Sequence, residues 1–478
     1  MGQTGLRTRR WRLMLAALAA IAALGAAGCG GGDEEATAPP AAPAEPAEPP
    51  AEPPAEPPAE TEAPPAETGE PAETGEAPPA SDSVTDYVAY VGGPGGEADP
   101  SLEPIKIGYL NQEGGPVVIA SPVTTPGAHM TVKFINEQAG GIGGHPVELV
   151  ECFVAQNEEE GQQCGQQFAN DPDIVAVVTG AVAVGSESFH AALAGSKPVV
   201  VGVSVNPVDS TQETAAILFG DAQYILAPYA TFARDVLGTT SAALIYPEGA
   251  GQDSAAAGQA SAFEAAGIPV EVVSYPVTTP DLTVPLTAAG AQDADLVMPV
   301  IIPPECVKFQ QAILQLGIPE EKVLASPICL TPTTIEGLGD FPKWIYAIAS
   351  KLTFDVTDPG VAEYQELVRS VVPDEADQLI GDPWVNVVFG ELTTLAKWLN
   401  ALGPDNITTE GIVEQMKAFR GPLALGSPEI QCGKYPKAPG VCNDHTQFYQ
   451  YYGADATPAP MQKAGDWVGP PEGWVAPF

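Results

Sequence analysis

Residues 174–203 read IVAVVTGAVAVGSESFHAALAGSKPVVVGV, and this stretch decides the fold class. Its two ends, 174–179 and 198–203, are rich in Val throughout, and the segment 186–194 between them has the composition of a helix. Strands that are apolar at nearly every position are buried on both faces, which is typical of a parallel sheet covered by helices. The stretch therefore predicts a strand–helix–strand unit of an α/β protein.

The same alternation continues on both sides of this unit. The further strands are predicted at 105–110, 147–152, 242–246, 270–275, 295–299 and 322–325, and the further helices at 126–138, 158–169, 223–236, 253–266 and 305–316. Two successive doubly wound units predict two Rossmann-like lobes with a hinge. We expect ligands to bind in the cleft between the lobes, at the carboxyl ends of the strands.

The chain is expected to pass between the lobes more than once. A helix predicted at 382–402 returns to lobe 1, and the segment from Leu423, which contains an aromatic strand at 448–452, crosses back to lobe 2. The expected domain boundaries are 102–222 and 353–424 for lobe 1, 223–352 and 425–460 for lobe 2, and 461–478 for a C-terminal tail.

The first 28 residues have the composition of an export signal. Four arginines precede an Ala/Leu-rich stretch at 13–24, and the small residues Ala26, Ala27 and Gly28 stand directly before Cys29. A cysteine at this place resembles a bacterial lipoprotein box, although the position three before it, usually Leu, is Ala26. We expect lipidation of Cys29; the alternative is an ordinary secretory signal cleaved near Ala27.

Residues 30–80 consist almost entirely of Ala, Pro, Glu, Gly and Thr. Prolines favour an extended chain and the glutamates repel one another, so we expect a stalk over 29–101 that cannot form a core. A stalk behind a lipidated cysteine predicts an extracytoplasmic protein that is anchored to the membrane by lipid.

The charge balance excludes one class of partner. The chain has 61 acidic and 19 basic residues, a formal net charge of −42. Nucleic acid is not expected as a partner, because binding phosphates needs clustered Lys and Arg. After the signal, no apolar run is long enough to span a bilayer.

Cysteine usage agrees with export. Six cysteines remain besides Cys29, in three pairs that are local in sequence: Cys152 and Cys164, Cys306 and Cys329, and Cys432 and Cys442. Six cysteines allow 15 connectivities, of which pairing between neighbours is the simplest. A zinc site is the competing interpretation, but it requires C-x-x-C spacing or nearby histidines, and the chain has only four histidines. We expect disulfides, no metal and no cofactor.

Residues 134–147, FINEQAGGIGGHPV, resemble the stretch after the first helix of type I periplasmic binding proteins of the leucine/isoleucine/valine-binding class. Residues 105–108 resemble the first strand of that class, Asn206-Pro207 the end of its fourth strand, and Tyr246 with Gly251-Gln252 the start of its second lobe. The cysteine pairs also look similar to those of actinobacterial lipoproteins in the class. The resemblance implies a protein, expected to be a monomer, that captures a small-molecule solute and delivers it to an ABC permease.

Such a receptor should contact its solute through loops at the strand ends. In lobe 1 the candidate residues carry hydroxyl, amide or free backbone N–H groups that can hold a carboxylate: Gln112, Glu113, Val184, Gly185, Ser186, Ser204 and Asn206. For each residue, a turn or helix-capping role is the alternative.

Lobe 2 departs from the family pattern. Amino-acid binders of the class carry a carboxylate after the strand that here ends near Ala325, but this chain reads Ser326-Pro327-Ile328-Cys329, and the family's loop tyrosine is replaced by Ala250. Apolar candidates in the cleft are Ile302, Ile328 and Trp384. The predicted classes of solute are therefore amide-like and apolar molecules as well as amino-acid-like ones.

Enzyme signatures are missing from the sequence. It contains no G-x-S-x-G, H-E-x-x-H or G-x-x-x-x-G-K motif, and oxidised cysteines cannot serve as nucleophiles. We therefore expect a binding protein. The alternative is an extracellular ligand-sensing module that acts in trans on a membrane receptor.

Overall fold

The computed structural model describes residues 83–115, 121–180, 182–249, 251–355, 357–457 and 459–477. The chain divides into two compact units, Met1–Glu76 and Ala77–Phe478, and every described residue belongs to the second. The expected signal peptide, Cys29 and most of the expected stalk lie outside the described residues.

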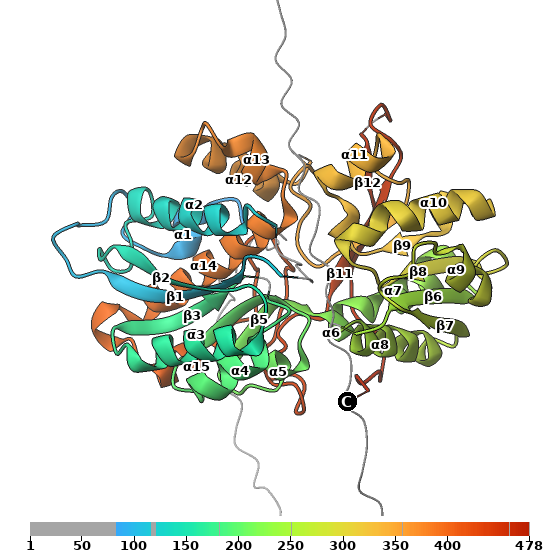
Figure 1. Ribbon diagram of the computed structural model, residues 1–478. Helices are drawn as coiled ribbons and strands as arrows, with labels where there is room; N and C mark the ends of the chain where they lie inside the picture. Colours follow the sequence, from blue (N-terminus) through green and yellow to red (C-terminus); the bar gives the residue numbers. More distant parts are fainter. Residues whose placement is uncertain are drawn as a thin grey trace, which may run out of the picture. The chain divides into compact units, whose positions relative to one another are not determined.

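Lobe 1 is built on a five-stranded parallel sheet in the order β2-β1-β3-β4-β5 (Figure 1). Its strands are β1 (Ile105–Gln112), β2 (Val147–Val154), β3 (Ile174–Thr179), β4 (Val199–Ser204) and β5 (Ala215–Asp221). Its helices are α1 (Tyr87–Val91), α2 (Thr124–Glu137), α3 (Glu158–Asn170), α4 (Ser186–Leu193), α5 (Pro207–Ser210), α12 (Pro359–Val371), α13 (Ala376–Ile380), α14 (Pro383–Leu402) and α15 (Thr409–Ala418). Helices α2 and α14 cover one face of the sheet and α3 and α4 the other (Figure 1), which is why the central strands are apolar on both sides.

Lobe 2 contains a parallel sheet in the order β7-β6-β8 and a mixed sheet in the order β12-β11-β10-β9, joined by a bridge between Val297 and Val323. Its strands are β6 (Ala242–Pro247), β7 (Val270–Tyr275), β8 (Leu296–Pro299), β9 (Leu324–Ala325), β10 (Ile345–Ile348), β11 (Thr446–Tyr451) and β12 (Met461–Val468). Its α-helices are α6 (Ala222–Leu226), α7 (Pro228–Phe232), α8 (Gln252–Ala265), α9 (Thr283–Ala288), α10 (Cys306–Leu316) and α11 (Pro332–Leu338). A π-helical turn, Ala233–Leu237, continues α7.

The chain crosses between the lobes three times, after β5, after β10 and before β11. Side-chain hydrogen bonds link the third crossing to the backbone of neighbouring segments. Asn443 Nδ2 of the third crossing donates a hydrogen bond to the carbonyl oxygen of Phe219 in β5 (3.3 Å), and Thr446 Oγ1 donates to the carbonyl oxygen of Ile225 in α6 (2.8 Å). The first and third crossings therefore lie side by side, as in a hinge made of several chain segments.

The predicted elements are largely present. Strands β3 and β7 have the expected bounds, and the other predicted strands differ by one to two residues at their ends. The helix expected at 223–236 is divided into α6, α7 and a π-helical turn, because Pro228 lacks the N–H that a continuous helix requires.

The folded part begins before the expected boundary at Leu102. Tyr87 and Val91 of α1 are buried in the lobe 1 core, and the hydroxyl groups of Tyr90 and Thr394 of α14 are 2.9 Å apart and hydrogen-bonded. The expected stalk at 29–101 therefore ends before α1, where the first apolar aromatic residues allow the chain to pack.

The C-terminal boundaries also differ from expectation. Cys432 and Cys442 lie in the lobe 1 core and not in lobe 2, because the segment before the third crossing pairs with β5 through a bridge between Ile217 and Val441. The expected tail at 461–478 contains β12, which pairs with β11 in the mixed sheet of lobe 2. Beyond it, Trp474 Nε1 donates a hydrogen bond to Ser261 Oγ of α8 (2.9 Å).

The expected disulfide pairing is confirmed: Cys152 with Cys164, Cys306 with Cys329, and Cys432 with Cys442. The described residues contain no cluster of three or more His, Cys, Asp or Glu placed to hold a metal ion. Among the helices in the described ranges, none is long and apolar enough to cross a membrane.

Candidate functional site

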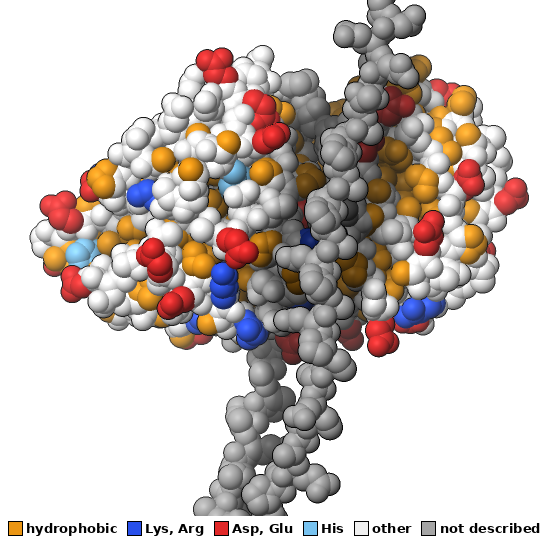
Figure 2. All heavy atoms as spheres, turned by 90° about the horizontal axis from the view of Figure 1, so that it is seen from below, with side chains coloured by type: hydrophobic (Ala, Val, Ile, Leu, Met, Phe, Trp, Pro, Cys, Tyr) orange, Lys and Arg blue, Asp and Glu red, His pale blue; other side chains and the backbone are white. Residues whose placement is uncertain are grey.

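A cavity of about 160 Å³ lies where the three crossings meet the two lobes. Because a single water molecule needs only ~10–15 Å³ of such space, the cavity has room for a small organic molecule. Figure 2 shows hydrophobic side chains on the lobe 2 side of the hollow between the lobes. The cavity is lined by Val203, Val205, Phe219, Ala222, Ile225, Leu226, Tyr229, Gly251, Gln252, Ala255, Pro299, Val300, Ile301, Ser326, Pro327, Ile328, Ala347, Ile348, Ala349, Ser350, Pro383, Trp384, Val387 and Thr446.

The fold positions these residues through the carboxyl ends of its strands. Strands β4 and β5 end at the lobe 1 wall, and β8, β9 and β10 end at the opposite wall. In open α/β sheets this edge is where ligands bind. The cavity therefore lies where the sequence predicted a binding cleft.

The first turn of α14 supplies the largest side chain of the lobe 1 wall. Asp382 caps this helix by accepting a hydrogen bond from the backbone N–H of Trp384 (2.9 Å), which fixes the direction in which the helix starts. Trp384 is half-buried and packs with Ala183 and Val205 in a small apolar cluster. One turn further along α14, Val387 continues the apolar wall.

The polar groups of the cavity are neutral. Tyr229 is 2% exposed, and among the described residues its hydroxyl has no hydrogen-bond partner. The hydroxyls of Ser326 and Ser350 likewise have no partner in the described part of the chain. Thr446 already donates to Ile225. None of the described residues that line the cavity is Asp, Glu, Lys, Arg or His.

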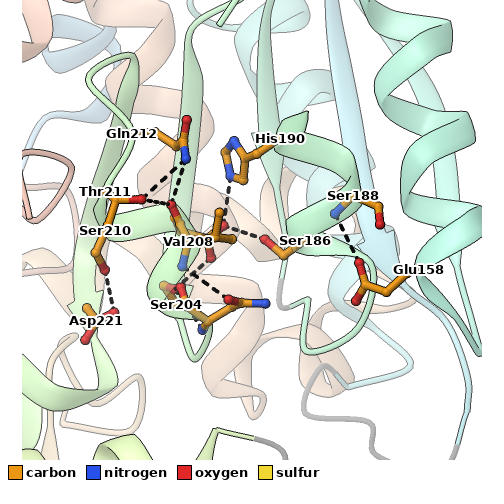
Figure 3. A network of polar contacts seen from close by, with 12 residues as sticks. Glu158, Ser186, Ser188, His190, Ser204, Val208, Ser210, Thr211, Gln212 and Asp221 are labelled. Atoms are coloured by element: carbon orange, nitrogen blue, oxygen red, sulfur yellow. Dashed lines mark hydrogen bonds and ion pairs between the residues drawn. The ribbon is translucent and has the colours of Figure 1, made fainter. Parts of the chain in front are cut away.

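Three of the predicted lobe 1 contacts belong instead to a network around Asp209, of which Figure 3 labels Ser186, His190 and Ser204. The carboxylate of Asp209 accepts hydrogen bonds from Ser186 Oγ (2.5 Å) and Ser204 Oγ (2.7 Å) and lies 2.8 Å from His190 Nε2. Asn206 caps α5 by accepting a hydrogen bond from the Val208 N–H (3.2 Å). These side chains hold the loop after β4, and none of them lines the cavity.

The other predicted lobe 1 residues also have partners within their lobe. Gln112 Oε1 accepts hydrogen bonds from the N–H groups of Ala183 (2.8 Å) and Val184 (3.3 Å), and Glu113 Oε1 accepts one from Thr125 Oγ1 (2.7 Å). Gly185 has a φ of 91° before α4. None of Gln112, Glu113, Val184 and Gly185 is among the lining residues.

For the apolar candidates the sequence interpretation was closer. Ile328 and Trp384 line the cavity, whereas Ile302 does not, and its neighbour Ile301 does. Sequence reasoning missed Tyr229 and Ser350. Ser350 belongs to a crossing that only the folded chain brings to the cavity. The sequence did point to the position of Ser326, because the resemblance places it where amino-acid binders of the class have a carboxylate.

Two carboxyl groups, Asp221, which is buried, and Asp382, which is half-buried, stand next to the cavity without lining it. Asp221 caps α6 by accepting a hydrogen bond from the Gln223 N–H (2.9 Å), and burial raises its pKa to about 6. Burial also raises the pKa of Asp382, the cap of α14. Each carboxyl group therefore occupies a helix start that borders the cavity.

A third carboxyl group lies deeper in lobe 1. Glu391 is fully buried on α14, and neither of its carboxyl oxygens has a hydrogen-bond partner in the described structure. Burial holds the pKa of this group well above its usual range. A Cβ atom on Gly202 of β4 would stand only 2.9 Å from Glu391 Cδ, which places the carboxyl group directly against the sheet.

Two α/β lobes, three crossings and a cavity enclosed by both lobes define a hinged two-lobed binding protein. The family described as periplasmic binding protein matches residues 104–432, and the chain belongs to this family. Members of the family bind solutes and are not enzymes.

Solved structures share the fold at low sequence identity. A leucine-binding protein from Thermotoga maritima is 16% identical, with a TM-score of 0.59 over 77% of this chain and 99% of that one. A fatty acid ABC transporter substrate-binding protein from Thermomonospora curvata is 14% identical, with a TM-score of 0.61 over 80% and 97%. A Rhodopseudomonas palustris solute-binding protein in complex with 4-hydroxybenzoate is 14% identical, with a TM-score of 0.60 over 78% and 99%. No curated protein matches the chain significantly.

Proposed function

We propose that the protein is the solute-binding component of an ABC importer. It captures a small amino-acid-like, amide-like or apolar organic solute between its lobes and delivers it to a permease in the membrane. The observation that carries this proposal is the cavity at the strand ends, which both lobes and all three crossings enclose.

The mechanism follows from this enclosure. A solute that contacts both walls, such as Trp384 on lobe 1 and Ile328 on lobe 2, has more contacts when the lobes are closed than when they are apart. Its binding therefore shifts the population toward the closed form, by no more than its differential affinity for the two forms. No bond is made or broken, so the solute leaves unchanged.

Relatives with the same fold support the role and allow a range of solutes. The similar structures are titled as binding proteins for leucine or fatty acid, or are complexes with 4-hydroxybenzoate. These molecules share an apolar skeleton and a carboxylate, and differ in their other polar groups. The class of solute that this chain binds therefore has to be inferred from the polar groups of its own cavity.

The proposed setting is the outer face of a membrane. The basic and apolar leader, the small residues before Cys29 and the Pro/Glu-rich stretch at 30–80 support a lipid anchor and a stalk on which the protein, proposed to be a monomer, reaches its permease. Metabolic labelling with a radioactive fatty acid tests the anchor: the wild-type protein should be labelled and the Cys29→Ala variant should not. Equal labelling of both would refute a lipid on Cys29.

Native mass spectrometry of the purified protein, followed by a thermal-shift screen of small organic solutes, tests the binding function. A cognate solute should raise the unfolding midpoint and be recovered unchanged. Trp384→Ala should weaken binding about 10-fold or more, because it removes a large apolar wall. Trp467→Ala is the matched control, since Trp467 is equally half-buried in β12 but does not line the cavity. Chemical conversion of the solute, or equal loss of affinity in both variants, would contradict the proposal.

A further inference from the structure

The cavity combines apolar walls with neutral hydroxyl groups. Its lining contains no Asp, Glu, Lys, Arg or His among the described residues. The gaps in the described ranges between residues 83 and 477 hold only Pro, Val, Ile and Ala. Those positions therefore contribute no ionisable side chain to any site in this part of the chain.

We infer that the solute is an uncharged, mainly apolar organic molecule with one small hydrogen-bonding group, such as an amide, alcohol or ketone. This inference rests on the proposed binding function and narrows the class of solute. The carbon skeleton fills the apolar space next to Trp384, and the polar group reaches the free hydroxyls of the cavity.

A positively charged group on the solute has no partner here. Burying an ammonium ion without a carboxylate is costly, because its hydration is lost and nothing replaces it. The adjacent carboxyl groups of Asp221 and Asp382 do not line the cavity, and both accept hydrogen bonds from backbone N–H groups at the helix starts they cap. An amine or a free amino acid is therefore disfavoured.

A carboxylate on the solute also lacks a partner. Two basic residues are adjacent in sequence to the lining: Lys351, next to Ser350, and His445, next to Thr446. The ammonium group of Lys351 is paired with Asp358 (2.5 Å), and His445 Nδ1 lies 2.7 Å from the carboxyl group of Asp444. The helix starts of α6 and α14 are already capped by Asp221 and Asp382, so their positive ends are not available to a carboxylate on the solute. An anionic solute would thus be buried among apolar groups and beside two acids.

A neutral polar group fits the cavity better. The hydroxyls of Tyr229, Ser326 and Ser350, which have no partner among the described residues, can each donate or accept a hydrogen bond. Burial raises the pKa of Tyr229, so its phenol stays protonated. A carbonyl or hydroxyl group on the solute would satisfy these groups without any charge being buried.

Isothermal titration calorimetry with matched compounds tests the inference. Three skeletons (branched aliphatic, linear aliphatic and benzyl) are each prepared as an amide, an alcohol, a carboxylate and an amine. For the skeleton that binds best, the amide or alcohol should bind about 10-fold or more tightly than the carboxylate and the amine, since burying an unpaired charge is costly. Tighter binding of either charged compound would overturn the inference.

A charge-insertion variant tests the same point from the side of the protein. Ser326→Asp should raise affinity for the amine and lower it for the neutral compound, each about 10-fold, because a carboxylate then lines the cavity. Ser370→Asp, which adds the same charge on the exposed side of α12, should leave both affinities unchanged. Thermal unfolding of each variant checks that it folds, and the compound series on the wild-type protein remains decisive if Ser326→Asp does not.

The two proposals fail in different ways. If a carboxylate or an amine binds tightly and raises the unfolding midpoint, the solute-binding function stands and the uncharged class is wrong. If no compound binds and no small molecule co-purifies with the wild-type protein, the solute-binding function fails, and the inference on charge fails with it.

Discussion

The hydroxyl group of Ser210 donates a hydrogen bond of 2.6 Å to the carboxyl group of Asp221, at the point where the chain first leaves lobe 1. Asp221 is buried at the end of β5, and burial raises its pKa to about 6, with a further contribution from the neighbouring carboxylate of Asp209. The first crossing is therefore held by an acid that titrates a little below neutral pH.

The Asp221→Asn variant should remove part of the pH dependence of stability. An acid with a raised folded-state pKa binds its proton more tightly in the folded protein, so the wild-type free energy of unfolding should fall as the pH rises from about 4 to about 6. A pKa difference of about two corresponds to a loss of at most roughly 3 kcal/mol. Urea unfolding from pH 4 to pH 7 measures this.

Burial also raises the pKa of other acids, such as Asp382 and Glu305, so the decisive quantity is the difference between variants. The pH slope of Asp221→Asn should be shallower than that of the wild type, whereas Asp293→Asn, at an exposed position in lobe 2, should follow the wild type. Identical slopes for all three proteins would refute a raised pKa at Asp221.

Replacing Glu391 by Met should stabilise the protein. The carboxyl group is buried without a hydrogen-bond partner among the described residues, so an apolar side chain of similar size removes a desolvation cost of about 1–3 kcal/mol. The midpoint of thermal unfolding should rise for Glu391→Met and stay nearly constant for Glu414→Met, on the exposed side of α15. A clear fall for Glu391→Met would show that the carboxyl group has a structural partner.

Replacing Gly390 by Ala should destabilise lobe 1. A Cβ atom at this position of α14 would approach the carbonyl oxygen of Ala424 to 2.6 Å and clash with the ring of Phe219 in β5. We expect a loss of about 1–3 kcal/mol, as for overpacking of other cores. In the Gly381→Ala control the added Cβ has no neighbour closer than 3.5 Å and φ is −74°, so stability should be unchanged or slightly higher.

The disulfides should differ in their effect on binding. The bond between Cys306 and Cys329 holds the turn Pro327–Cys329, which contributes to the cavity wall, whereas Cys152 and Cys164 lie away from it. Replacing either pair by alanines should cost about 2–4 kcal/mol of stability. Only loss of the Cys306–Cys329 bond should also weaken solute binding, by about 3-fold or more. Without this bond the turn that forms the cavity wall is free to move, and the free energy of ordering it on binding lowers the affinity. Equal affinities of the two double variants would contradict this role.

The sequence predicted the parts of the fold that have regular apolar patterns. Strands β3, IVAVVT, and β7, VEVVSY, are rich in β-branched residues and bounded by turns, and they were assigned correctly. Strand β12, MQKAGDWV, was missed because its side chains carry little strand preference and its structure depends on pairing with β11. Helix α1 was missed because it follows a long Pro- and Glu-rich stretch that masks the start of the fold.

The site was less predictable than the fold. The predicted serines follow the expected strands, but Asp209 on the short helix α5 draws Ser186 and Ser204 into a buried network. This contact forms only because the fold brings the start of α4, the end of β4 and α5 together, and no local sequence pattern predicts it. Trp384 and Ile328 are the predicted residues that do line the cavity, because large apolar residues at strand and helix ends have few other places to pack.

Electron–electron double resonance measures the central claim, closure around a solute, most directly. Spin labels carried by unnatural amino acids at Glu187 of α4 and Glu264 of α8, both exposed and in different lobes, leave the disulfides intact. On saturation with the compound that binds best in calorimetry, the distribution of distances between the labels should become shorter and narrower. An unchanged distribution in the presence of bound compound would contradict the account.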